Sequence, residues 1–185
     1  LHIVEDNNDA YAQIRESHGL NTLLRVLKES QRSGSEEAHI DGCLSLILTL
    51  ASAPDAGGGI DCRAELCEIG YPEVLAAVLS NPATPTATLE VALSAFKSIM
   101  AGRRSLKSTE DNRQRCVRWA GKVVALLQRA AKNGAASSPS SSSSSSASSS
   151  TVWSRLTCLG LETLAVMAEG SEKRLAAVVA CGGLA

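Results

Sequence analysis

Few residues in this sequence could carry chemistry, and none of them completes a catalytic or phosphate-binding motif. Ser94 and Lys97 match the Ser-x-x-Lys pair of penicillin-binding enzymes, but the Ser-Asp-Asn and Lys-Thr-Gly companions of that pair are missing. Gly121 and Lys122 match the end of a phosphate-binding loop, yet Val123 stands where that loop needs Ser or Thr. We therefore expect no enzymatic activity and no cofactor.

The potential metal ligands also lack the spacing of a metal site. His2, His18 and His39 have no Cys or His at zinc-ligand spacing, and no second pair of ligands accompanies Cys62 and Cys67. The six cysteines stand singly within apolar helical patterns, unlike the regular loop spacings of a small disulfide scaffold. These patterns predict no metal site and favour a reducing, intracellular setting, either cytoplasmic or nuclear.

The strongest charged feature is a basic stretch over residues 103–122. Within it, Arg115, Arg118 and Lys122 have the spacing of one helical face. That face could dock an acidic partner or a nucleic acid, or it could be an ordinary solvated helix surface. The last interpretation is favoured, because only Trp119 could serve as an interleaved stacking residue and the net charge of the chain is −1.

The elements that must position these residues are predicted to be helices. Aromatic residues make up only 3% of the 185 residues, and Leu, Ala, Val and Ile supply most of the core candidates, which suits helix-on-helix packing. The longest apolar stretch, residues 43–53, contains Ser and Thr and is too short to cross a bilayer. The sequence starts at Leu1 within a helical pattern, so we expect a monomeric fragment of a longer protein.

A corner pattern occurs four times along the chain. In each copy an apolar residue lies four positions before an anchor, and the anchors are His18, Gly70, Gly121 and Gly182. Apolar residues recur five and about nine positions after the first three anchors. This spacing predicts that one helix ends and another begins at each anchor, where glycine can adopt a positive φ.

A second pattern, an apolar stripe with offsets of zero, four, seven and eight residues, follows each of the first three anchors. Its copies are Cys43, Ile47, Leu50, Ala51; Ala92, Phe96, Ile99, Met100; and Gly160, Leu164, Met167, Ala168. Each stripe predicts one face of a longer helix. A repeat unit is thus expected to run as short helix, corner, helix, loop and longer helix.

The two patterns divide the single domain, residues 1–185, into repeat units. Three units are expected at about residues 7–56, 57–107 and 108–170, and a fourth begins over residues 171–185. The Ser-rich tract 135–151 lengthens the third unit and is expected to be a disordered insertion, because it offers little apolar surface to bury.

The repeated corner and stripe resemble the armadillo repeat family. The resemblance implies an all-α fold, an α-solenoid wound as a right-handed superhelix, in which the third helix of each unit lines a concave, partner-binding face. Units of about 50 residues are longer than is usual for that family, so a HEAT-like or mixed helical repeat is the alternative architecture.

The resemblance also assigns candidate partner-binding positions on the third helices. Peptide-gripping members of the family carry Asn and Trp at two of these positions. Here the equivalent residues are Ser45, Thr49, Ser94, Ser98, Glu162 and Val166. Without Asn and Trp, a folded partner or a helix is a better match than an extended peptide.

The leading functional hypothesis is therefore a protein-binding scaffold that uses the concave face. One alternative is nucleic-acid or acidic-partner binding through residues 103–122, although we expect no nucleic-acid partner. Another is that the chain is the regulatory part of a longer multidomain protein.

Overall fold

The computed structural model describes residues 13–14, 16–33, 37–52, 62–101, 110–136, 146–169, 176 and 179, and the regular structure of these residues is helical throughout. The helices are α3 (Gly19–Ser33), α4 (Glu37–Ser52), α5 (Cys62–Ile69), α6 (Tyr71–Ser80), α7 (Thr86–Ala101), α8 (Glu110–Ala136) and α9 (Ser146–Ala168). The predicted all-α class is confirmed for this part of the chain. Among the described helices, none is long and apolar enough to cross a membrane.

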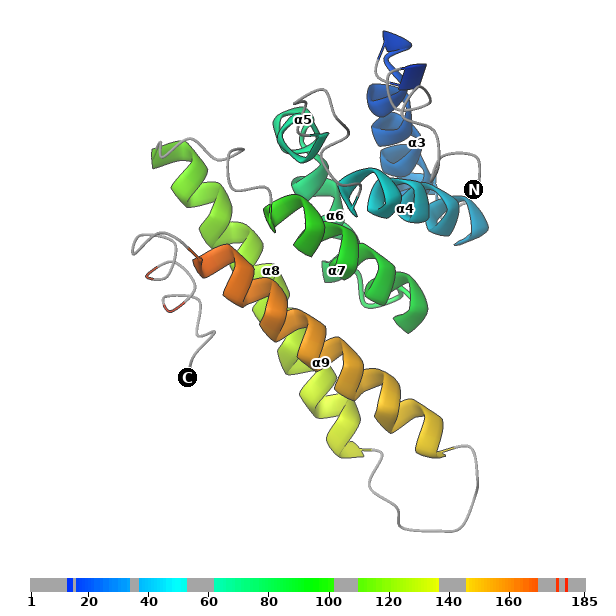
Figure 1. Ribbon diagram of the computed structural model, residues 1–185. Helices are drawn as coiled ribbons and strands as arrows, with labels where there is room; N and C mark the ends of the chain where they lie inside the picture. The colour runs from blue at the N-terminus through cyan, green and yellow to red at the C-terminus, as the bar shows by residue number, and fades with distance from the viewer. Residues whose placement is uncertain are drawn as a thin grey trace.

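The helices form two layers. In one layer α4 packs against α7, and α7 packs against α9. In the other, α3 contacts α6, and α6 contacts α8. Figure 1 shows α7 and α9 in front of α6 and α8, with α4, α7 and α9 running in the same direction. Helices α4, α7 and α9 are therefore successive neighbours in space, and so are α3, α6 and α8.

The apolar stripes of α4, α7 and α9 face the core between these layers. Ile47, Phe96 and Ile99 are fully buried, and Leu164 is 4% exposed. The ring of Phe96 meets the ring of Trp119 on α8 edge to face, with centroids 6.2 Å apart. Aromatic pairs prefer this arrangement. One continuous cluster of buried residues extends from α3 to α9 and joins the successive units.

Two of the predicted corners are present. His18 has a φ of 54° just before α3, and Gly70 has a φ of 100° between α5 and α6. This left-handed conformation suits glycine because it has no Cβ, and Pro72 follows in the first turn of α6. The hydroxyl of Tyr71, the first residue of α6, donates a 2.5 Å hydrogen bond to the Leu20 carbonyl at the start of α3.

The third predicted corner, at Gly121, is wrong. Gly121 lies inside α8, which is continuous from Glu110 to Ala136. Buried Cys116, Trp119 and Val123 fall at helical spacing across the glycine, so a single straight helix can bury the apolar residues on both of its sides. An interior glycine costs a helix only about 1 kcal/mol relative to alanine, which this packing offsets.

The predicted insertion, 135–151, has narrower limits in the structure. Helix α8 extends to Ala136, and α9 begins at Ser146, well inside the Ser-rich tract. Serine is only a moderately poor helix former, so a helix anchored by packing can extend through several serines. Residues 137–145 lie outside the described part of the chain, as do Gly182 and nearly all of the predicted fourth unit, 171–185.

Candidate functional site

The six predicted partner-binding residues lie on three neighbouring helices. Ser45 and Thr49 belong to α4, Ser94 and Ser98 belong to α7, and Glu162 and Val166 belong to α9. Glu162 is exposed and the other five are half-buried. Val166 packs against the hydrophobic core, so it is less available to a partner than the sequence suggested.

Polar contacts link α4 to α7 along this surface. The hydroxyl oxygens of Ser52 and Ser98 are 3.3 Å apart, and the Thr88 hydroxyl donates a 2.7 Å hydrogen bond to Asp41. Within α4, the Thr49 hydroxyl donates to the Ser45 carbonyl one turn earlier, at 3.0 Å. Because Thr49 already bonds to its own helix, it has less hydrogen-bonding capacity left for a partner.

Two ion pairs link α7 to α9. Lys97 Nζ lies 2.7 Å from Glu162 Oε2, and a guanidinium nitrogen of Arg155 lies 3.5 Å from Glu90 Oε2. Lys97 thus bonds a carboxylate of the neighbouring helix. Both pairs are partly exposed, so each is expected to add little stability.

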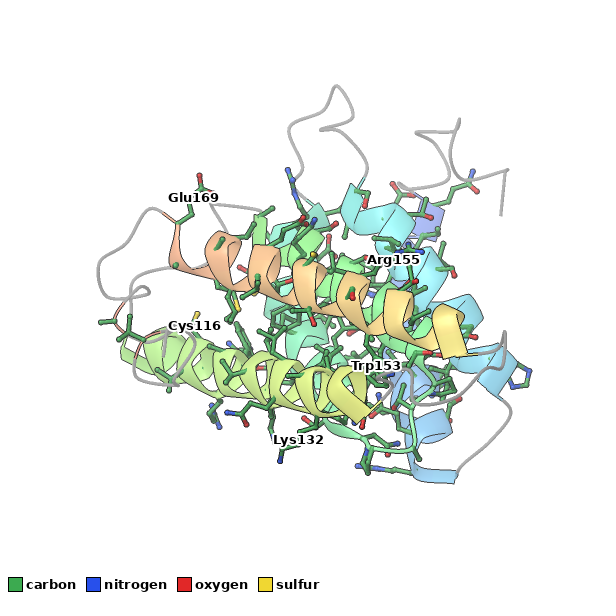
Figure 2. All side chains as sticks on the ribbon, turned by 90° about the horizontal axis from the view of Figure 1, so that it is seen from below. Cys116, Lys132, Trp153, Arg155 and Glu169 are labelled. Carbon is green, nitrogen blue, oxygen red and sulfur yellow. The ribbon has the colours of Figure 1, made fainter. Side chains whose placement is uncertain are left out.

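A hollow of about 390 Å³ lies between α7 and α9, and it brings two of the predicted residues together. Ser94 and Glu162 both line it. The other lining residues are Glu90, Thr151, Ser154, Arg155, Cys158 and Leu159. Ser45, Thr49, Ser98 and Val166 are not part of this hollow. Figure 2 shows α9 and α8 as separate layers, with Lys132 projecting from the side of α8 that faces away from α9.

Several residues of this surface were missed by the sequence analysis. Glu90 places one buried carboxylate oxygen, Oε1, at the hollow without a hydrogen-bond donor among the described residues. Leu161 on α9 is 52% exposed, unusually high for a large apolar side chain. Leu161 directly follows the buried Gly160, and one helical position is a rotation of about 100°, so Leu161 lies to the side of the buried stripe.

The three predicted residues of the basic patch differ in their contacts. Arg115 forms an ion pair with Glu73 of α6, with a 2.7 Å hydrogen bond from Nε, and its guanidinium lies 5.3 Å from the centre of the Trp119 ring. Arg118 and Lys122 are exposed. All three lie on α8, but one of the three cations is already committed to a contact within the protein.

Five of the six cysteines lie in the described part of the chain. No disulfide joins Cys43, Cys62, Cys67, Cys116 or Cys158. Burial raises the pKa of the Cys43 thiol, which opposes formation of the nucleophilic thiolate. Across the same residues, no group of three or more His, Cys, Asp or Glu side chains is placed to hold a metal ion.

The described fold and surface define the class of the molecule as all-helical, with equivalent helices packed side by side. Comparisons with protein-family models, with curated proteins and with solved structures gave no match. The function must therefore be argued from the contacts and surfaces of this chain itself.

Proposed function

We propose that the chain is part of an armadillo-type α-solenoid that binds another protein along the surface formed by α4, α7 and α9. Solenoid repeats pack mainly against their neighbours, and this is the pattern in which α4 meets α7 and α7 meets α9. The equivalent phase of the three buried stripes supports the same assignment, because it gives the three helices equivalent outer faces.

The observation that carries the proposal is the hollow between α7 and α9. Ser94 and Glu162, chosen only by their offset from the apolar stripes, line the same hollow although they are far apart in the sequence. Concave sites with a few converging polar groups are typical of binding surfaces. Glu90 also lines the hollow, and its Oε2 pairs with Arg155 on the facing helix.

The expected partner is a folded protein or a helix. Positions that would hold amide side chains for gripping an extended backbone carry Thr49, Ser98 and Val166 instead, and Val166 is partly buried. Leu161 offers apolar area on the same helix as the hollow-lining residues. A partner recognised by shape and by an apolar contact matches this surface. In this proposal the chain catalyses no reaction and acts inside the cell.

A quantitative pull-down with the full-length protein tests this assignment. Ser94→Arg combined with Cys158→Arg would fill the hollow with two long cationic side chains, and both positions are at least partly exposed. We expect partners recovered by the unmodified protein to be lost from this variant. Circular dichroism and the melting temperature would first establish that the variant folds normally.

The matched control is Ala125→Arg combined with Gln128→Arg. It adds the same charge at two exposed positions of α8, outside the hollow. The control should retain the partners. If the hollow variant folds and keeps every partner, or if the control loses the same partners, the proposed surface is wrong.

A further inference from the structure

Helix α8 presents a row of four cations toward α6, and the two at the ends of the row are anchored. Arg115, Arg118, Lys122 and Arg129 fall on one helical face by their spacing. At one end Arg115 pairs with Glu73, and at the other Arg129 donates to the Asn81 carbonyl at 3.1 Å. Arg129 also lies 3.5 Å from the Leu79 carbonyl.

The two middle cations have no such partner. Arg118 and Lys122 are exposed, and no ion pair or hydrogen bond of their side chains occurs among the described residues. Glu73 is the only acidic residue that lines the hollow between α6 and α8, and Arg115 already neutralises it. The charge that remains uncompensated there is therefore positive.

The unpaired cations border a hollow of about 420 Å³ between α6 and α8. Its lining combines Arg118 and Lys122 with Glu73, Ser80, Asn81 and the largely apolar surface of Ala76, Ala77 and Trp119. A second hollow, of about 610 Å³, lies on the other side of α6 against α3 and α4, and Ala77 and Asn81 line both. The two hollows therefore meet at the C-terminal end of α6.

The second hollow carries no charge of its own. Its lining residues are Ser30, Gln31, Ile40, Ala77, Val78, Asn81, Ala83, Thr84, Pro85 and Thr88. A ligand that crosses α6 from one hollow to the other would thus pass from a cationic site to a neutral one of mixed polarity. A ligand that is acidic at one end only would match this asymmetry.

We propose that these two hollows bind a peptide segment of a partner protein, with acidic residues over Arg118 and Lys122 and uncharged residues across Ala77 in the hollow beside α3. The cationic hollow lies between α6 and α8, whereas the second hollow reaches Ile40 of α4 and Thr88 of α7. Neither shares a lining residue with the hollow between α7 and α9, so this site does not depend on the function assigned to the α4, α7 and α9 surface. A partner peptide is chosen over a single small anion because the two hollows together are longer than one anionic group.

A nucleic acid fits this site less well than an acidic peptide. Base stacking requires an accessible aromatic face, but Trp119 is only 3% exposed and Arg115 covers its ring. A nucleic acid would also place regular negative charge over the second hollow, where the lining offers no cation. The pairing of charge at one end with apolar and uncharged polar groups at the other favours the peptide.

Fluorescence anisotropy with a labelled peptide tests the proposal on the full chain. The probe carries two Glu-Asp pairs followed by Leu, Ser, Leu and Ala, and the reference probe has Gln and Asn in place of the acids. We expect the acidic probe to bind, and the reference probe to bind at least about tenfold more weakly. Affinity for the acidic probe should fall as salt rises, because the contacting charges become screened.

Two variants locate the site. Arg118→Glu with Lys122→Glu reverses the cationic end, and Ala77→Trp blocks the junction of the hollows at an exposed position without changing charge. Each should weaken binding by about tenfold or more. The matched control, Arg25→Glu with Arg32→Glu, reverses two exposed charges on α3 and should bind as the unmodified chain does.

Three results would overturn the proposal. One is that the acidic probe does not bind the unmodified chain. Another is equal weakening by the α3 control, which would indicate a general charge effect. The third is tighter binding of a single-stranded oligonucleotide of the same net charge, with Ala77→Trp leaving the peptide affinity unchanged.

Discussion

Tyr71, the first residue of α6, links that helix to the start of α3. Its ring is fully buried, and its hydroxyl bonds the Leu20 carbonyl at the start of α3. Burial, with a smaller contribution from the nearby Cys43 thiol, raises the pKa of Tyr71 far above its ordinary value of 10. The hydroxyl is therefore held in its neutral, donating form in the folded protein.

Replacing Tyr71 with Phe should lower the free energy of unfolding by about 1 kcal/mol, because it removes one buried hydrogen bond while keeping the ring. Urea denaturation followed by circular dichroism measures this. The replacement of Tyr71 should also change the dependence of stability on pH. Above pH 10 the unfolded chain releases the Tyr71 proton while the folded chain keeps it, so stability should fall as pH rises.

The Tyr71→Phe variant has no hydroxyl to ionise, so it should not show this part of the fall in stability at high pH. The difference in unfolding free energy between the two proteins should therefore shrink between pH 9 and pH 11. A difference that stays constant over this interval would mean that Tyr71 ionises equally in both states, contrary to the burial described here.

Sequence spacing identified some site residues but could not identify their partners. Ser94 and Glu162 follow from their offsets within single helices, which is local information. The ion pair of Glu90 with Arg155 and that of Arg115 with Glu73 depend on how far one helix slides along another. That displacement is set by packing of whole side chains, so no pattern within one helix reveals it.

At the scale of the helices, close packing at Gly160 explains why a small residue begins the stripe of α9. A Cβ added at Gly160 would lie 2.6 Å from Leu127 Cδ2 and 3.1 Å from its Cγ, on the facing helix α8. In contrast, a Cβ added at Gly42, an exposed glycine inside α4, would meet nothing within 4 Å. The two helical glycines form a natural pair for comparison.

Gly42→Ala should raise the free energy of unfolding by about 0.5–1 kcal/mol, because alanine is the better helix former and has free space there. Gly160→Ala should raise the free energy of unfolding by less, or should lower it, since Leu127 must move to admit the new methyl group. Chemical denaturation of both variants checks this. Equal stabilisation by the two changes would show that α8 and α9 do not approach as closely as described.

Helix α8 shows the limit of predicting elements from anchors alone. The corners at His18 and Gly70 have positive φ, whereas Gly121, identified by the same pattern, lies within a continuous helix. What distinguishes Gly70 from Gly121 is Pro72, two residues after Gly70, because proline lacks the N–H that a continuous helix needs and its ring collides with the preceding turn. No proline lies near Gly121, so the helix continues through that glycine.

For the whole molecule, the apolar stripes predicted the helical class, the helices α4, α7 and α9, and much of the core. They could not define the surfaces. The hollow between α7 and α9, and the pair of hollows across α6, arise where helices from different units fail to fill the space between them. Such gaps depend on three-dimensional packing and have no counterpart in a linear pattern.

The two proposals give the molecule two separate binding faces. One is formed by α4, α7 and α9, and the other is the pair of hollows on either side of α6. The hollow between α7 and α9 shares no lining residue with that pair, so binding at one face should leave the other accessible. The central proposal concerns the first face.

Hydrogen exchange, measured by mass spectrometry on the full-length protein with and without the partner recovered in the pull-down, tests that proposal most directly. Exchange should slow in peptides from α7 and α9, including those that contain Ser94 and Glu162, with a smaller effect in α4. Exchange in the exposed turns of α8 should be unchanged. Protection confined to α6 and α8, with α7 and α9 unaffected, would contradict the assignment of the partner-binding face.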